Sequence, residues 1–564
     1  MKTVLRIKKI LTICFGILTL AACDEQLTEL NQNPNGLDPE TANPNMIMPA
    51  VLGPAAQNYL NLGFGNIAGV MQHTQKDGWF EGHNNYDWNA QEWTDWYGLL
   101  RNNTLMYDRA VVLDWKFHQG VAMTMKGFIF GTITDFWGNA PYTDALKGDE
   151  GGLNYEFPEF DNQEVIYEGV IDDLREAVSL FAEADDNGIS EASDLYYGGN
   201  IASWRQFANS LLIRYYMRIS EKNPAVARSG LEAVVSSGVY IKNPADDATL
   251  EYTGGGSDIW PSEYAGDNGT SFRNLKPCQT LVDQLRATND PRMSVWFATV
   301  HCQWVADPTL TTKVDEFIRK DGEIQTGVTS LTDLNYVEEI AAGHVFTRHY
   351  NPNTFGGTID NNEIVGLPPG LMQPSSYNLN PTPGQVLENQ HVSQLAGIYR
   401  QGGGDLLKAR LISAAEISFT LAEAALNGWS VGDAQAHYES AIRFSLENWG
   451  VEDQYDTFMA EDGVAFDGTL EQIMEQKWVA SWTSASEAWF DWRRTGLPSL
   501  APGPASIQPV LPVRFNYGSD EINNNEANYR EALNSLEITP YSGPRENDSQ
   551  WSKTWLLQGT GYPW

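Results

Sequence analysis

The chain has 564 residues and a formal charge of −37, with 42% hydrophobic and 19% charged residues. This composition is typical of a folded globular protein, and the length is enough for two to four domain-sized units. A surface this acidic repels nucleic acid and anionic lipid head groups, so we exclude nucleic-acid binding. Aromatic residues make up 12% of the chain, and side chains of this kind suit binding surfaces as well as cores.

The first 22 residues have the organisation of an export signal. A basic start (residues 2–9) precedes an uncharged run, 10–22, which is shorter than the roughly 20 residues that span a bilayer. The run ends in Leu20-Ala21-Ala22-Cys23, which resembles the lipobox of bacterial lipoproteins. We expect cleavage before Cys23, lipidation of Cys23, and a charge lowered from −37 to −41 because four cations are lost with the signal. An ordinary cleavage site that happens to precede a cysteine is the alternative.

Residues 23–44 are polar and rich in Asn and Pro, which predicts a flexible tether. Residues 45–70 are weakly helical. Residues 71–90 carry aromatic side chains without the period of a helix or a strand, so we expect a loop. Because aromatic side chains in a loop have no helical face to fill, we select from it the candidate ligand contacts Trp79, Phe80, Asn84, Asp87 and Trp88.

Helical periodicity dominates the next stretch of the chain. It predicts helices beginning at Gln91, over residues 121–134 and over residues 162–184, the last with one apolar stripe. A further helix is expected to begin near Ser203, because Ser203 and Gln206 have the spacing of a capping box.

Residues 243–380 depart from the helical pattern. A short helix is expected at 279–286, the run 296–304 is compatible with a strand, and 309–380 is an irregular insertion rich in Gly, Pro and Asn. Long loop regions are more often functional than structural. Aromatic rings stack on the apolar faces of sugars and polar neighbours bind hydroxyl groups, so the remaining candidate ligand contacts are Trp260, Tyr264, Asp267 and Trp304.

The last third of the chain returns to helices. Residues 413–427 and 433–449 predict two antiparallel helices whose combined length is close to that of a tetratricopeptide unit. Another helix begins at Thr469, which forms a second capping box with Gln472. The run 487–494 ends in Thr-Gly-Leu-Pro, with Gly and Pro where helices stop.

No arrangement of residues indicates catalysis. Glu416 and Glu423 lie on one helix face, and we interpret them as structural acids paired with Arg or backbone groups. His344 and His349 have no third ligand at metal-binding spacing. We therefore predict no metal site and no cofactor, although Asp-Asp-Asn-Gly at 185–188 resembles a fragment of a calcium loop.

Two cysteines, Cys278 and Cys302, remain besides the predicted lipid site and Cys14 of the signal. An exported chain allows a disulfide between them, but their separation in the sequence does not decide whether they pair.

Several stretches together resemble the SusD/RagB family, the surface nutrient-binding lipoproteins of Bacteroidetes, and in particular its SusD-like branch. They follow the same order along most of the chain, at residues 31–36, 136–142, 194–200, 204–211, 281–292, 414–424, 476–478, 487–498 and 512–528. The chain departs from the family at Tyr517-Gly518, where the family usually has Tyr-Pro, and its tail, 534–564, has no recognisable counterpart.

The resemblance implies a mainly α SusD-like fold, with TPR-like helix pairs as scaffold and long irregular, loop-rich insertions. We expect one domain over residues 45–564, with ligand-binding insertions near 71–90 and 243–380. The implied function is non-enzymatic: a lipid-anchored outer-membrane protein, facing the cell exterior, that captures oligosaccharide and delivers it to a SusC-like TonB-dependent transporter. An oligopeptide or glycopeptide ligand is the alternative, since an acidic groove would favour basic ligands.

Overall fold

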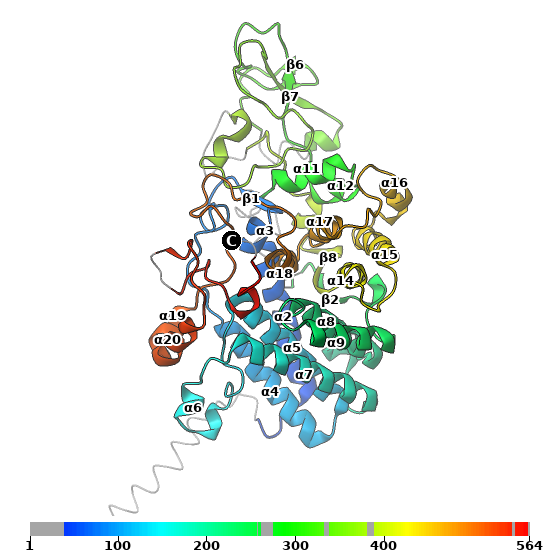
Figure 1. The fold of residues 1–564 in the computed structure, drawn as a ribbon. Coiled ribbons are helices and arrows are strands. Elements are labelled where there is room, and N and C mark those ends of the chain that lie inside the picture. Colours follow the sequence, from blue (N-terminus) through cyan, green and yellow to red (C-terminus); the bar gives the residue numbers. More distant parts are fainter. Residues whose placement is uncertain are drawn as a thin grey trace, which may run out of the picture.

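The computed structural model describes residues 39–255, 258–260, 275–331, 338–380, 389–543 and 547–561 (Figure 1). The predicted signal, Cys23 and most of the predicted tether lie outside these residues. Within them the protein is mainly α-helical, as predicted. No helix of this described part is long and apolar enough to cross a membrane.

The α-helices are α2 (Pro44–Phe64), α3 (Asn66–Val70), α4 (Thr94–Leu113), α5 (Lys116–Trp137), α6 (Leu153–Glu156), α7 (Gln163–Glu183), α8 (Ile201–Arg218), α9 (Pro224–Ser237), α11 (Gln279–Ala287), α12 (Arg292–Trp296), α14 (Ala414–Leu426), α15 (Ala434–Glu447), α16 (Tyr455–Met459), α17 (Leu470–Ala480), α18 (Ala485–Thr495), α19 (Ser519–Asn524) and α20 (Glu526–Asn534). The strands are β1 (Thr74–Lys76), β2 (Ala248–Thr253), β3 (Leu275–Pro277), β4 (Gln303–Ala306), β5 (Arg319–Lys320), β6 (Glu323–Ile324), β7 (Phe346–Tyr350) and β8 (Gly403–Ile412).

The lower body in Figure 1 is a stack of helices around α5. Nearly every side chain from Phe117 to Trp137 is buried, so α5 is a central helix that is enclosed on all sides. Helix α7 instead buries one stripe, which includes Ile166, Val170 and Leu174, against it. The helices predicted over residues 121–134 and 162–184 are therefore confirmed.

Helix caps explain where the predicted starts are right and where they are wrong. Thr469 caps α17, since its hydroxyl accepts a hydrogen bond from the Gln472 backbone N–H at 3.2 Å. A helix does begin near Ser203, but the capping role predicted for Ser203 is wrong. Helix α8 begins at Ile201, because the side chain of Asn200 accepts from the Ser203 N–H at 3.1 Å and so caps the helix three residues earlier.

A long strand that the sequence analysis did not anticipate, β8, pairs antiparallel with β2. Its buried side chains alternate at Leu407, Ala409 and Leu411, the period of a half-buried strand. The strand ends one residue before the N-cap of α14, Ser413, so the pairing fixes where the helix pair α14 and α15 enters the body. That helix pair has the extent predicted for it.

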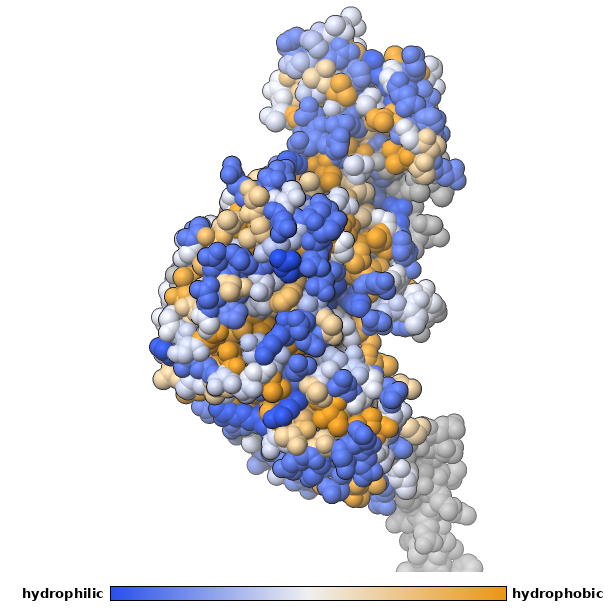
Figure 2. All heavy atoms as spheres, turned by 90° about the vertical axis from the view of Figure 1, so that its right-hand side faces the viewer, coloured by the Kyte–Doolittle hydropathy of each residue, from blue (hydrophilic) through white to orange (hydrophobic). Residues whose placement is uncertain are grey.

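The described residues between 300 and 395 form a lobe at the top of Figures 1 and 2. Its sheet has the order β4-β7-β5-β6, with β4 and β7 parallel and the other pairs antiparallel. The insertion predicted over 309–380 thus contains short strands. The strand suggested for 296–304 is wrong in its first part, because α12 extends to Trp296 and β4 begins only at Gln303.

Small apolar cores hold the lobe together. One consists of Cys302, Ile318, Leu331 and Phe346. Another consists of Val300, Val365, Leu367 and Val392. Cys278 instead lies before α11, and both Cys278 and Cys302 are free thiols.

Helix α18 carries a row of charges into the centre of the body. Glu487 accepts a hydrogen bond from Arg218 at 2.7 Å and lies 3.5 Å from Arg214, and both arginines belong to α8. Arg214 donates to Glu416 of α14 at 2.7 Å, and Arg218 lies 3.3 Å from Asp135 of α5. Glu487, Arg214, Arg218 and Asp135 are buried and Glu416 is largely buried, so each of these ions depends on its partners for compensation.

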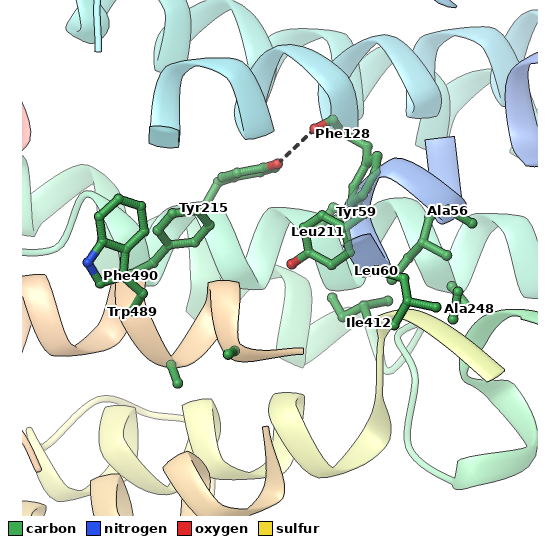
Figure 3. Close-up of a cluster of buried hydrophobic side chains, with 14 of the residues drawn as sticks. Ala56, Tyr59, Leu60, Phe128, Leu211, Tyr215, Ala248, Ile412, Trp489 and Phe490 are labelled. Carbon is green, nitrogen blue, oxygen red and sulfur yellow. Dashed lines mark hydrogen bonds between the residues drawn. The ribbon is translucent and has the colours of Figure 1, made fainter. Parts of the chain in front are cut away.

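The next turn of α18 extends this network. Asp491 lies 2.7 Å from Lys477 of α17 and accepts from Arg494 at 3.1 Å. Arg494 donates to Glu423 at 2.7 Å. Glu416 and Glu423 are thus paired with arginines, as the sequence analysis interpreted them. Buried side chains of α2, α8 and α18, including Tyr59, Tyr215 and Phe490, form a hydrophobic cluster (Figure 3). This cluster contacts the network, since Tyr59 donates to Glu487 at 2.5 Å and the Arg218 guanidinium lies 4.5 Å from the centre of the Phe490 ring.

We expect Glu487→Gln to lower the free energy of unfolding by about 3–5 kcal/mol at pH 7, because Arg214 and Arg218 stay buried with less compensation. Burial alone would raise the pKa of Glu487, but these arginines and the hydroxyl of Tyr59 hold it below its usual value. A lowered folded-state pKa gives stability that is present above about pH 4 and is lost at lower pH. Urea unfolding between pH 3 and 7 should therefore show a weaker acid dependence in the variant.

Glu526→Gln is the matched control for this substitution. Glu526 forms an exposed pair with Arg530, so its loss should cost at most about 1 kcal/mol. Equal unfolding free energies for the two variants at pH 7 would contradict the role given to Glu487.

Candidate functional site

The loop that follows β1 is fastened to that strand by polar side chains. The Asn84 amide accepts from the Lys76 N–H at 2.9 Å and donates to the Lys76 carbonyl at 2.8 Å. The His83 ring lies 3.1 Å from the Thr74 hydroxyl, and burial lowers the pKa of His83 well below its usual value. Asn84 is fully buried, so this predicted ligand contact has a structural role in the loop.

Trp79 stands at the tip of this loop with 61% of its side chain exposed. Its φ of 52° lies in the left-handed region, which non-glycine residues adopt only where the surroundings impose it. The Phe80 carbonyl accepts from the N–H groups of His83 and Asn84, and the Asn85 side chain accepts from Gly82 and Asp87. The indole is therefore presented to solvent on a loop with a defined conformation.

Two other segments join this loop to form one surface. The Gly370 N–H donates to the Gln75 side chain at 2.9 Å, and the Ile507 N–H donates to the Asn85 carbonyl at 3.2 Å. The backbone of Gly503 lies so close to that of Pro369 that a Cβ added to Gly503 would lie 1.7 Å from the Pro369 carbonyl oxygen. We name this surface the Trp79 face; its exposed or half-buried members are Trp79, Phe80, Asp87, Met372 and Ile507.

The sequence analysis did not select Met372 or Ile507. They are 66% and 45% exposed and lie in loops with no aromatic cluster. The available indication was the Gly and Pro content of 366–370 and 501–504, which marks turns but does not show which turns meet.

Trp88 does not belong to the exposed surface. It is 3% exposed, and its ring meets the edges of Phe515 and Trp489 at centroid distances of 5.2 and 5.9 Å. The expectation that Trp88 offers a face for stacking is corrected, because residues from the distant C-terminal third enclose it.

Trp260 and Trp304 are likewise core side chains. Trp260 is 1% exposed and packs against Phe64 and Tyr399. Trp304 is 2% exposed, stacks on His391 at 4.4 Å and donates its indole N–H to the Asn378 carbonyl at 2.9 Å. The prediction that these tryptophans form an exposed stacking platform is therefore wrong. Among them, only Trp79 is exposed.

Tyr264 and Asp267, the remaining predicted contacts, lie outside the described residues.

The other titratable groups considered in the sequence have protein partners. His344 lies 2.7 Å from Asp321, and His349 lies 3.1 Å from Asp307. Hydrogen bonds from Thr309 and His349 lower the pKa of Asp307 to about 2. Across the described ranges, no group of three His, Cys, Asp or Glu side chains has the arrangement of a metal site.

Comparison with protein families agrees with this architecture. The family model described as "Starch-binding associating with outer membrane", SusD-like_2, matches residues 34–308 and 360–518. The chain belongs to the SusD-like family. Its members are binding proteins that associate with the outer membrane, in agreement with the predicted non-enzymatic role. The interval without a match, 309–359, contains β5, β6 and β7 of the upper lobe.

Several solved structures share this fold. A SusD homologue from Bacteroides fragilis NCTC 9343 aligns with a TM-score of 0.67 at 19% identity, covering 92% of this chain and 100% of that chain. A chitin-binding protein aligns with a TM-score of 0.68 at 20% identity over 92% and 100% of the two chains. A SusD homologue from Bacteroides uniformis ATCC 8492 gives 0.66 at 20% identity over 91% and 98%. A search of curated proteins finds no match.

Opposite responses to truncation should separate the buried and exposed indoles. Trp88→Ala is expected to lower the free energy of unfolding by about 3–5 kcal/mol, because it leaves a cavity between Trp489 and Phe515. Trp79→Ala should change it by less than about 0.5 kcal/mol. Chemical denaturation measures both, and a similar loss in the two variants would show that the Trp79 loop is part of the core.

Proposed function

We propose that the protein is a cell-surface glycan-binding lipoprotein. Anchored through a lipid on Cys23, it captures an oligosaccharide on the Trp79 face and delivers it to a SusC-like TonB-dependent transporter. The observation that carries the proposal is an exposed tryptophan on an ordered loop, in a chain whose family is described as starch-binding.

The physical properties of the Trp79 face support sugar capture. An indole ring offers a flat apolar surface on which the C–H face of a pyranose ring stacks. The hydrogen bonds at Asn84 and Asn85 fix the loop before ligand arrives, so little conformational entropy is lost on binding. Phe80 and Met372 add partly exposed apolar surface, and the carboxylate of Asp87 accepts hydrogen bonds from hydroxyl groups.

An oligopeptide or glycopeptide ligand is the second candidate. The observation that favours it is the charge of −37, which attracts basic peptides more strongly than neutral sugars.

Calorimetric titration with neutral oligosaccharides and with tryptic peptides distinguishes the two ligand classes. We expect a neutral oligosaccharide to bind, and Trp79→Ala to weaken its binding about tenfold, or ~1.4 kcal/mol, because the stacking surface is removed. Ile538→Ala is the control, since Ile538 is 59% exposed and lies outside the Trp79 face. Binding of peptides alone would favour the second candidate. Hydrolysis of a chromogenic glycoside would refute both.

The proposed anchor has its own test. An exported Cys23→Ser protein lacks the thiol that carries the lipid, so it should appear in the soluble fraction and support slower glycan uptake than the native protein. Unchanged membrane association after fractionation would refute lipidation at Cys23.

A further inference from the structure

The three loops of the Trp79 face are hydrogen-bonded to one another in a closed triangle. The first loop follows β1, which Figure 1 places between the helical body and the upper lobe. It is joined to the second, because the Gly370 N–H donates to the Gln75 side chain, and to the third, because the Ile507 N–H donates to the Asn85 carbonyl. The Ala505 N–H donates to the Gly370 carbonyl at 2.7 Å and joins the second loop to the third. The loops therefore form one surface of defined shape.

Each of the three loops exposes a large apolar side chain. Trp79 is 61% exposed, Met372 is 66% exposed and Ile507 is 45% exposed. Single exposed apolar side chains are common on protein surfaces, whereas a patch of them marks a binding surface. The thioether of Met372 is at most a weak acceptor, and the alkyl chain of Ile507 forms no hydrogen bonds. The apolar character of the Trp79 face thus extends beyond the indole ring.

An unsubstituted sugar does not match this distribution of apolar groups. Its C–H face stacks on the indole of Trp79, but the edge of its ring carries hydroxyl groups. A hydroxyl group placed against Met372 or Ile507 loses water and gains no hydrogen bond, which is unfavourable. A methyl group in the same place removes apolar surface from water, which is favourable. The patch therefore favours a sugar with methyl groups at its edge.

A carboxylate adjoins the apolar patch. Asp87 is exposed, and its backbone N–H donates to the Asn85 side chain at 3.1 Å, while the Asn85 carbonyl accepts from Ile507. A carboxylate accepts hydrogen bonds and donates none, so it suits the N–H of an acetamido group or a hydroxyl group next to an O-acetyl group. The formal charge of −37 disfavours sugars that carry carboxylate or sulfate groups.

We propose that the Trp79 face selects neutral glycans whose sugars carry acetyl groups. This selection depends on the proposed glycan capture and specifies the class of glycan that is captured. One sugar ring stacks on the indole of Trp79, its acetyl methyl group contacts Met372 and Ile507, and Asp87 accepts a hydrogen bond from the neighbouring N–H or O–H. Trp79 supplies affinity for any pyranose, whereas Met372 and Ile507 determine which pyranose is preferred.

Calorimetry with matched pairs of sugars tests this selection. The first pair is the N-acetylglucosamine trimer and the glucose trimer of the same linkage, and the second is O-acetylated xylotriose and xylotriose. In at least one pair the acetylated sugar should bind about tenfold more tightly, because a methyl group in an apolar site contributes roughly 10- to 200-fold and an open surface gives the lower end. The pair that shows the preference identifies the source of the acetyl group, N-acetyl or O-acetyl.

Met372→Gln should remove the preference for the acetylated sugar. Glutamine is close to methionine in length but places an amide where the thioether was, so the ratio of the two affinities should fall toward one. Met46→Gln is the matched control, because Met46 is also 66% exposed and lies in α2, outside the Trp79 face. Ile507→Thr should lower the same ratio from another loop, which keeps the selection testable if Met372→Gln lowers the melting temperature.

Trp79→Ala separates capture from selection. Because the indole stacks on either member of a pair, this variant should weaken the binding of both and leave the acetylated sugar preferred.

Three outcomes would overturn the selection. Equal affinities within both pairs would refute it and leave glycan capture in place. A ratio that stays at the native value in both Met372→Gln and Ile507→Thr would refute the role of these side chains. Failure of every sugar to bind would refute the proposed function, on which the selection depends.

Discussion

The buried charge network around α18 constrains the arrangement of the whole body. Helix α18 comes from the last fifth of the chain, yet Glu487 meets arginines of α8, and one of these reaches Asp135 of α5. A buried ion left without its partner is strongly destabilising, so α18 is held in the register that pairs every charge. The network therefore joins the first and last parts of the chain into one body with one continuous apolar core.

The same constraint reaches the Trp79 face through α17. Lys477 of α17 pairs with Asp491, and the neighbouring Trp478 donates its indole N–H to the Met71 carbonyl at 2.8 Å. The His73 ring lies 2.9 Å from the Trp478 carbonyl. Burial lowers the pKa of His73 to about 3, so this contact keeps one protonation state across ordinary pH. The start of β1, and with it the loop that presents Trp79, is thereby held to the most constrained part of the core.

The sequence was informative wherever local patterns decide the structure. The apolar stripe of α7, the cap at Thr469 and the pairing of Glu416 and Glu423 with arginines were all predictable from spacing and residue type. The sequence was less informative where contacts with distant segments determine the structure. Nothing near Trp88 indicates that Phe515 encloses it, and β8 becomes a strand because β2, some 150 residues earlier, offers it hydrogen bonds. The error at Ser203 has a local cause, since Asn200 and Ser203 are both suitable caps for the same helix and the structure uses Asn200.

The ends of the segment that forms most of the upper lobe lie next to each other. The Asp307 N–H donates to the Tyr350 carbonyl at 2.7 Å, so residues 307–350 leave the fold and return to it at one point. A segment whose two ends lie together can change in length at little cost in chain entropy, because the entropy cost of closing a loop grows only slowly with its length. Ile318, Leu331 and Phe346 of this segment pack in a small core with Cys302, apart from the large core of the helices below. The length and sequence of this segment can therefore change while the body beneath it keeps its structure.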